Sequence, residues 1–352
     1  YNITKAYGNQ NYRNFTGHTD EIKSIAFIPG QREFFTAGAD GKIIKWGLDK
    51  RNQSLQVIYS GSEIINVLAV SPDEKWLASG TQNAGIRMIP LSGNEIGYEL
   101  KGHSGPVRSL IFSYDGRYLY SASLDGKVLK WDLSTKTSTD ISTGLGEVTS
   151  IDLSSDNKYI AGLNNDGKVI VWDPEKNSDN FRIEAAGKRI KAIRFKPDED
   201  ILAVGYTDGY FELWDIKSKS KISGMKAHTA DVNDIRFNSK FSQIATASND
   251  GSLKLWNSKD FTTLPISLED NEGIVITIEF SPDGQVIVSG TSGKSGNLKG
   301  RATNTDLLAQ DVCSAVTRNF SLEEWIAYVG KDIAFEETCP AKEYKIKVKE
   351  IK

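Results

Sequence analysis

The sequence predicts an all-β fold, a seven-bladed β-propeller, with a short α-helical extension at its C-terminus. Three regularities predict the propeller. Tryptophans recur about every 42 residues, since the steps between Trp131, Trp172, Trp214 and Trp256 are 41, 42 and 42. An Asp-Gly pair stands six residues before each of them, and three histidines keep a fixed distance from such pairs. A repeat of roughly this length is typical of propellers and solenoids.

Each repeat has the pattern of four short strands. Asp-Gly between two β-rich runs predicts a tight hairpin, because both residues accept a positive φ. In the first repeat, Phe34–Ala37 and Ile43–Trp46 flank such a turn, Ile22–Phe27 precedes them with an alternating pattern, and Leu55–Tyr59 follows. Four antiparallel strands every 42 residues describe one propeller blade.

The histidines fix the same register. Each of the three lies 22 residues before an Asp and 28 before a Trp, and a Ser or Thr stands four residues before that Asp. Blades one, three and six therefore carry complete sets, which are His18, Thr36, Asp40 and Trp46; His103, Ser121, Asp125 and Trp131; and His228, Thr246, Asp250 and Trp256.

With these sets the sequence resembles the WD-repeat family, in the stretches Gly17-His18…Lys45-Trp46, Gly102-His103…Trp131-Asp132 and Ala227-His228…Trp256-Asn257. The resemblance implies a hydrogen-bonded chain that runs from Trp through Ser or Thr and His to Asp. Each of these polar groups would be costly to bury alone, and each bond is worth about 1 kcal/mol net. We expect the twelve residues to lock their blades rather than to bind a partner.

The other four blades depart from the pattern. Their departures, in chain order, are Asn83 and Ile89 at the Asp and Trp positions of blade two, Gly144 at the His position of blade four, Ala186 at the His position of blade five, and Arg301 at the Trp position of blade seven. We expect blades two and seven to be the weakest.

Ring closure predicts the domain boundaries. Blade seven has only three strands of its own, and Tyr12–Phe15 has no blade to complete, so residues 12–16 are expected to supply its outer strand. Such closure removes an open sheet edge. The sequence thus divides into a polar lead-in (residues 1–11), the propeller (residues 12–303) and a helical C-terminal extension (residues 304–352).

The predicted extension carries an apolar stripe at Leu307, Leu308, Val312 and Val316 and then a capping-box pattern that starts at Ser321. The stretch 313–340 resembles the tail that follows WD repeats in bacterial multidomain signalling proteins. That resemblance implies an effector or NTPase-type region before Tyr1, and a start at Tyr in place of Met is consistent with a fragment or a processed product.

Cys313 and Cys339 admit two interpretations. They are either buried, reduced residues of a helical cap, or a disulfide that would stabilise the tail by roughly 3 kcal/mol. Reduced cysteines fit a cytoplasmic location, and a disulfide fits an extracytoplasmic one.

Composition narrows the function classes. The formal net charge is −3, with 39% hydrophobic and 25% charged residues. A slightly acidic chain does not indicate nucleic-acid binding, which favours basic patches, and no apolar run is long enough for membrane insertion. Three histidines and two cysteines leave little material for a metal site or a Cys–His nucleophile. We expect no metal, no cofactor and no catalytic residue.

The resemblance also implies a binding surface. The usual partner surface of WD-repeat propellers is the face that carries the His-containing loops, and its register here selects Lys23, Arg108, Glu147, Arg189, Lys191 and Asp231. Exposed arginines often anchor interfaces; the alternative is that these charges are merely solvated. The sequence therefore favours a protein- or peptide-binding scaffold or sensor domain of a larger, bacterial, multidomain signalling protein, monomeric as an isolated fragment. The alternatives are a hydrolase-type propeller enzyme and a structural or oligomerisation module.

Overall fold

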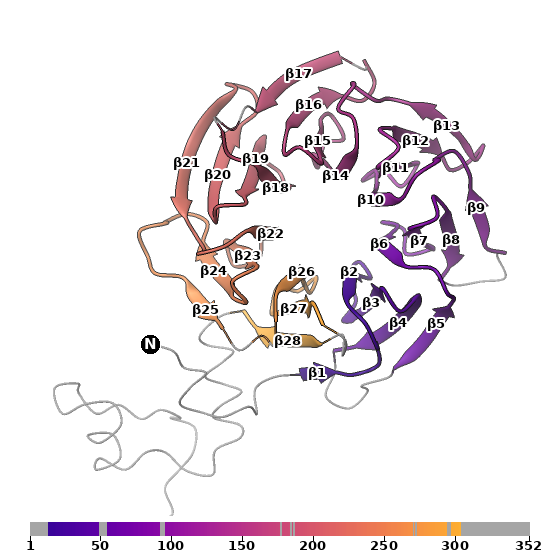
Figure 1. The fold of residues 1–352 in the computed structure, drawn as a ribbon, viewed down its shortest axis with the longest axis horizontal. Coiled ribbons are helices and arrows are strands. Elements are labelled where there is room, and N and C mark those ends of the chain that lie inside the picture. Colours follow the sequence, from indigo (N-terminus) through magenta and orange to yellow (C-terminus); the bar gives the residue numbers. More distant parts are fainter. Residues whose placement is uncertain are drawn as a thin grey trace, which may run out of the picture.

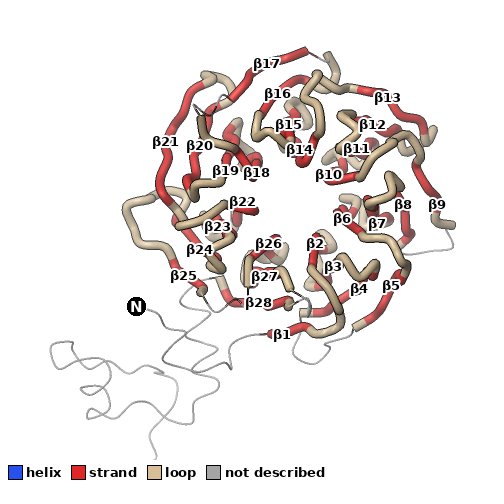
Figure 2. Tube along the Cα trace, in the orientation of Figure 1, coloured by secondary structure: helices blue, strands red, loops and turns tan. Residues whose placement is uncertain are grey.

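The chain forms the predicted all-β, seven-bladed propeller. The computed structural model describes residues 13–48, 55–91, 96–176, 178–183, 185, 187–269, 271, 273–293 and 297–303. Within these residues, seven four-stranded antiparallel sheets surround a central channel (Figure 1), and strands and loops occur without a helix (Figure 2). The predicted lead-in and the predicted helical extension with Cys313 and Cys339 lie outside the described residues.

In every blade the strands follow one another from the channel to the periphery; six blades are continuous meanders, and the seventh takes its outermost strand from the start of the chain. From the inside outward, the strands of the first four blades are β2 (Ile22–Phe27), β3 (Glu33–Gly38), β4 (Lys42–Gly47) and β5 (Gln56–Ser60); β6 (Ile65–Val70), β7 (Trp76–Thr81), β8 (Ile86–Pro90) and β9 (Tyr98–Leu100); β10 (Val107–Phe112), β11 (Tyr118–Ser123), β12 (Val128–Asp132) and β13 (Thr137–Asp140); and β14 (Val148–Leu153), β15 (Ile160–Asn164), β16 (Val169–Asp173) and β17 (Ser178–Ile183).

The same order holds in the last three blades. Their strands are β18 (Ile190–Phe195), β19 (Ile201–Tyr206), β20 (Tyr210–Asp215) and β21 (Ser220–Lys226); β22 (Val232–Asn238), β23 (Gln243–Ser248), β24 (Leu253–Asn257) and β25 (Ile266–Leu268); and β26 (Val275–Phe280), β27 (Val286–Thr291), β28 (Leu298–Ala302) and β1 (Arg13–Phe15).

The first strand of the chain closes the ring. β1 pairs antiparallel with β28, with Phe15 opposite Leu298 (Figure 1). Phe15 is 3% exposed and meets Phe34 and Trp46 of blade one edge to face, with ring centroids 5.3 and 5.5 Å apart. Edge-to-face pairs add about 0.5–1.5 kcal/mol to simple burial. The closing strand therefore packs blade seven against blade one.

The hydrophobic core is divided among the seven blade interfaces. Each of seven buried clusters combines apolar side chains from two neighbouring blades, as Val204 of blade five joins Val171 of blade four. Strand alternation supplies this arrangement, because it gives each sheet two faces and each face packs on an adjacent blade. The ring is consequently held by burial that is continuous around the channel.

In blades one, three and six, the structure brings each predicted set of four residues together. In blade three, Trp131 Nε1 donates to Ser121 Oγ (2.8 Å), His103 Nε2 lies 2.7 Å from the same oxygen, and His103 Nδ1 lies 3.0 Å from Asp125. The Asp125 carboxylate also accepts the N–H of Ser104 (2.8 Å), which fixes the loop that enters the blade.

The sets in blades one and six have the same geometry. Trp46 donates to Thr36 (2.7 Å), which lies 2.7 Å from His18, and His18 lies 3.0 Å from Asp40. The corresponding distances in blade six are 2.9 Å for Trp256–Thr246, 2.8 Å for Thr246–His228 and 3.1 Å for His228–Asp250.

Blade seven contains a substituted version of this set. Arg301 pairs with Ile287, as Trp256 pairs with Ile244 in blade six, so Arg301 occupies the Trp position as predicted. It is 2% exposed and donates to Ser289 Oγ and to Asn271 Oδ1, each at 2.8 Å. Ser289 and Asn271 stand at the Ser/Thr and His positions of the register. A guanidinium thus replaces the indole at the ring closure.

Two other blades contain incomplete sets with buried, unpartnered atoms. Ser79 Oγ in blade two and Trp172 Nε1 in blade four have no hydrogen-bond partner among the described residues. Blade two lacks the indole because Ile89 pairs with Leu77 at that position. Blade four lacks the hydroxyl because Gly162 stands there, in a space bounded by Leu145. The Ala186 position of blade five lies outside the described residues.

The unpartnered hydroxyl of blade two leads to a paired prediction. We expect Ser79→Ala to raise the free energy of unfolding by about 1 kcal/mol, because it removes a buried hydroxyl that gains no bond on folding. We expect Ser121→Ala to lower it by about 2–3 kcal/mol, because Trp131 and His103 both lose their shared partner. Urea denaturation followed by tryptophan fluorescence measures both, and equal losses in the two variants would contradict the register of blade two.

Candidate functional site

Every innermost strand carries one β-bulge near its start. The register with the second strand shifts between the first and third residues in all seven blades, namely at Ile22/Ser24, Ile65/Val67, Val107/Ser109, Val148/Ser150, Ile190/Ala192, Val232/Asp234 and Val275/Thr277. A bulge inserts one residue and turns its side chain out of the regular alternation.

The seven bulged residues surround one mouth of the channel, and we refer to them as the bulge ring. Its members are Lys23, Asn66, Arg108, Thr149, Lys191, Asn233 and Ile276, and all line a cavity of about 550 Å³ in the channel. Each strand begins at the end of a loop from the preceding blade, so the ring lies at the face that carries the His-containing loops. We call this face the His-loop face.

The structure divides the predicted partner-binding residues into two groups. Lys23, Arg108 and Lys191 are members of the bulge ring. Glu147, Arg189 and Asp231 each lie two residues before a bulged residue, on the loops that enter β14, β18 and β22, and do not line the cavity. The six residues thus form parts of one face, at two distances from the channel axis.

Contacts link several of these residues across blades. Lys191 Nζ forms an ion pair with Asp231 of the next blade at 2.8 Å. Arg189 donates to the carbonyl oxygen of Asn165, and Asn165 Nδ2 donates to Glu147 at 3.0 Å. Because these groups are exposed or half-exposed, such bonds contribute little to stability and leave the side chains able to exchange partners.

Two members of the ring have structural contacts. Asn66 Nδ2 donates to the carbonyl of Val107 in blade three at 3.1 Å, and Asn233 Nδ2 donates to the carbonyl of Val275 in blade seven at 2.8 Å. Both asparagines therefore tie their own innermost strand to the next one. The ring position joins adjacent blades as well as lining the mouth.

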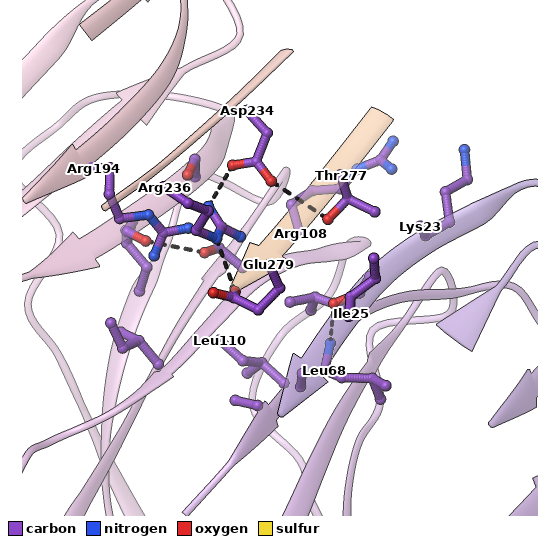
Figure 3. A pocket seen from close by; sticks show the side chains of 18 of the residues that line it. Lys23, Ile25, Leu68, Arg108, Leu110, Arg194, Asp234, Arg236, Thr277 and Glu279 are labelled. Carbon is purple, nitrogen blue, oxygen red and sulfur yellow. Dashed lines mark hydrogen bonds and ion pairs between the residues drawn. The ribbon is translucent and has the colours of Figure 1, made fainter. Parts of the chain in front are cut away.

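Below the ring lies an ionic layer that sequence reasoning missed. Arg194 pairs with Asp152 of blade four at 3.1 Å. Arg236 pairs with Glu279 of blade seven at 2.8 Å and with Asp234 (Figure 3). Residue spacing from the bulge would have identified four of the five residues of this layer. These four, Asp152, Arg194, Arg236 and Glu279, all lie three residues after a bulged residue. The corresponding residues of blades one to three are Ala26, Ala69 and Ile111.

Burial and ion pairing shift the pKa values of residues in this layer. Asp152 is 3% exposed, and burial raises the pKa of its carboxyl above the usual value although Arg194 and the N–H of Phe195 act to lower it. Burial acts to lower the pKa of Arg236, but Asp234 and Glu279 outweigh it and raise that pKa. The charges of Arg194 and Arg236 are thus partnered in the wall of the channel, on the side of blades four to seven.

Within the described residues, no group of three or more His, Cys, Asp or Glu side chains could hold a metal ion. No helix in that part of the chain has the length and hydropathy to cross a membrane. The chemistry that the site offers is a ring of mostly polar, partly cationic side chains around a cavity.

Comparisons with known proteins agree with the repeat. The family model for the WD domain, G-beta repeat, matches residues 9–47, 52–89, 94–132, 138–173 and 263–299, which together are more than half of the chain. The model for the anaphase-promoting complex subunit 4 WD40 domain matches residues 179–240.

Curated relatives match parts of the chain. Small ribosomal subunit protein RACK1 of Candida albicans is 32% identical over 35% of the chain and 41% of its own length. Protein groucho of Drosophila melanogaster is 31% identical over 37% of the chain and 19% of its own length. A U3 small nucleolar RNA-associated protein 21 homolog of Schizosaccharomyces pombe is 37% identical over 30% of the chain and 11% of its own length. The matches thus span less than half of each relative, and none of the three names describes an enzyme.

Proposed function

This chain belongs to the WD40 repeat family, and on that premise we propose that it binds a protein or peptide partner on the His-loop face, with Lys23, Arg108 and Lys191 at the channel mouth and Glu147, Arg189 and Asp231 around it. Propellers of this family typically act as scaffolds for protein interactions. The observation that carries the proposal is the bulge, repeated in seven blades, that turns one side chain per blade into the same cavity.

The opposite face offers fewer arguments for a partner. Register shifts also occur between the third and fourth strands of blades one, four and five, but only the shifts at the start of the innermost strands recur in all seven blades and turn side chains into one cavity. Bulges are frequent next to binding sites because they re-aim side chains. Arginine is also a common interface anchor, and the half-buried Arg108 and the exposed Arg189 both belong to the His-loop face.

The bacterial signalling setting is left out of the proposal. The three relatives described above are eukaryotic, so they do not support the bacterial signalling protein that the tail resemblance implies. The tail itself lies outside the described residues. We propose the scaffold or sensor role without that setting, and no feature of the described residues favours the hydrolase-type alternative.

Photo-crosslinking tests the binding face. A photoreactive residue in place of the exposed Glu147 should crosslink a partner from the cells that make the protein. The triple variant Arg108→Glu, Arg189→Glu and Lys191→Glu is expected to reduce that product tenfold or more, since it reverses three positive charges at the interface. A crosslink that joins only two copies of the chain would favour the oligomerisation module instead.

A matched control keeps the same charge change on the other face. Lys75, Lys176 and Lys217 lie in turns between β6 and β7, β16 and β17, and β20 and β21, where the strands reach the face opposite the His-containing loops. Their side chains are 60–75% exposed. Changing all three to Glu should leave the crosslink unchanged. An undiminished product in the folded Arg108, Arg189 and Lys191 variant would place the partner elsewhere.

A further inference from the structure

Positive charge gathers in the channel of a chain that is slightly acidic overall. Among the charged residues that line the cavity, five are cationic and two are acidic, whereas the whole chain has a formal net charge of −3. The cations are Lys23, Arg108, Lys191, Arg194 and Arg236, and the acids are Asp234 and Glu279. A charged cleft with low-dielectric walls focuses the field and raises the local concentration of ligands of opposite sign.

The deep cations are already engaged. Figure 3 shows Arg236 between Asp234 and Glu279, and Arg194 forms its own pair with Asp152. These pairs lie in the wall and neutralise each other locally. The excess charge is therefore at the mouth and not at the bottom of the cavity.

At the mouth, the cations belong to alternate blades. Lys23, Arg108 and Lys191 come from blades one, three and five, and the bulge ring contains no acidic residue. Lys23 and Lys191 pair with Glu21 and Asp231 of the surrounding loops at 2.7 and 2.8 Å. These pairs are between about a quarter and two fifths exposed, so each costs little to exchange for another anion.

Arg108 differs from the two lysines. Its contact among the described residues is a hydrogen bond of 3.4 Å to the neutral Asn66 Oδ1, and no acidic residue of the described chain pairs with it. A guanidinium offers a planar fork of donors that matches a carboxylate with two parallel hydrogen bonds. Arg108 is therefore the member of the ring that is best placed to take a carboxylate directly, with the two lysines adding charge.

We propose that the bulge ring receives an acidic side chain of the peptide partner, which inserts at the mouth of the channel and is held by Arg108 together with Lys23 and Lys191. The inference rests on the proposed function, because it names the chemistry of the partner for the same face. Below the ring, Arg194 and Arg236 are already paired with Asp152, Asp234 and Glu279, so they offer no unpaired charge to an anion that passes the ring.

Two synthetic peptides test the acidic preference. One alternates Glu and Gly, the other alternates Gln and Gly with the same length and dye, and fluorescence anisotropy at low ionic strength measures both. The Glu peptide should bind at least tenfold more tightly, and its affinity should fall as salt is added. Equal affinities, a preference for the Gln peptide, or no binding of either peptide would overturn the inference.

Single variants locate the contact. Arg108→Gln should weaken the binding of the Glu peptide about tenfold or more, because it removes a charge-assisted bidentate contact. Lys191→Gln should weaken the binding of this peptide less. Lys217→Gln on the opposite face is the control and should change nothing. An unchanged affinity in a folded Arg108→Gln protein overturns the assignment. If the crosslink at Glu147 persists while the Glu peptide fails to bind, the partner is not acidic but the proposed face stands.

Discussion

Replacing Trp131 by alanine is expected to lower the free energy of unfolding by about 4 kcal/mol. Trp131 is 2% exposed and lies in the cluster between blades two and three, against Leu119 and Leu129. Truncation of a buried aromatic side chain typically costs about 3–5 kcal/mol, because the surrounding side chains fill the cavity only in part. The change also removes one of the two bonds to Ser121. Urea denaturation at neutral pH, followed by circular dichroism, measures the loss.

The conservative variant Trp131→Phe separates packing from hydrogen bonding. Phenylalanine keeps much of the apolar volume but has no N–H, so its cost should be about 1–2 kcal/mol. A loss of several kcal/mol is a large part of the marginal stability of most proteins, which is about 5–15 kcal/mol. If Trp131→Ala unfolds at the urea concentration of the parent, blade three does not depend on this set.

Sequence periodicity was sufficient for the fold. The predicted strands Ile22–Phe27 and Val107–Phe112 agree with β2 and β10 at both ends. The apolar side chains of these innermost strands pack into the clusters between blades, which makes the strands recognisable as short apolar, β-rich runs. The outer strand Gln56–Ser60 begins one residue later than predicted, and its pattern is weaker because it is exposed at the periphery.

The candidate site was predictable only in part. The register selected Lys23, Arg108 and Lys191, which all reach the cavity. The register did not indicate that each of these three residues occupies a bulge. A bulge adds one unpaired residue, and the four residues after it still alternate as in a regular strand. The pairing of Arg194 with Asp152 depends on a contact between blades 42 residues apart, which no local pattern reveals.

Blade seven illustrates the same limit. Arg301 was placed at the Trp position from the sequence although it lies 45 residues after Trp256, and residue spacing does not give its partners. Asn271 lies 18 residues before Ser289, the spacing that separates His228 from Thr246. An Asn–Ser–Arg set would have been recognisable if amide and guanidinium groups had been considered as replacements for imidazole and indole. The predicted weakness of blade seven is therefore reduced by two hydrogen bonds.

The propeller is expected to lose stability as the pH falls from about 6.5 to about 4. Burial lowers the pKa of His228 from 6.5 to about 4, because desolvation disfavours its charged form more than Asp250 favours it. Burial also lowers the pKa values of His18 and His103. An unfolded chain binds protons at these histidines below about pH 6.5, whereas the folded chain keeps them neutral until a lower pH. Protonation therefore favours the unfolded state throughout this interval.

The size of the effect follows from the linkage. One pKa unit corresponds to about 1.36 kcal/mol, so His228 alone contributes about 3 kcal/mol of stability that is present above pH 6.5 and lost by about pH 4. A second loss follows at more acidic pH. Burial acts to raise the pKa of Asp250, but hydrogen bonds from Ser252 and from the N–H of Thr229 outweigh it and hold that pKa below the usual value. Its stabilising contribution is thus present above the ordinary carboxyl pKa and is lost as the pH falls through the lower, folded value.

Urea denaturation at about pH 7 and about pH 4.5 measures the first loss, and His228→Gln identifies its source. Glutamine can still hydrogen-bond to Thr246 and Asp250 but cannot bind a proton in this range. The variant should be less stable than the parent at neutral pH. Its free energy of unfolding should change less than that of the parent between the two pH values, and the difference should be roughly the contribution of His228. A variant with the full pH dependence of the parent would show that His228 is not the titrating group. The pH dependence of the free energy of unfolding would then have to come from His18 and His103, whose sets of hydrogen-bonded residues have the same geometry.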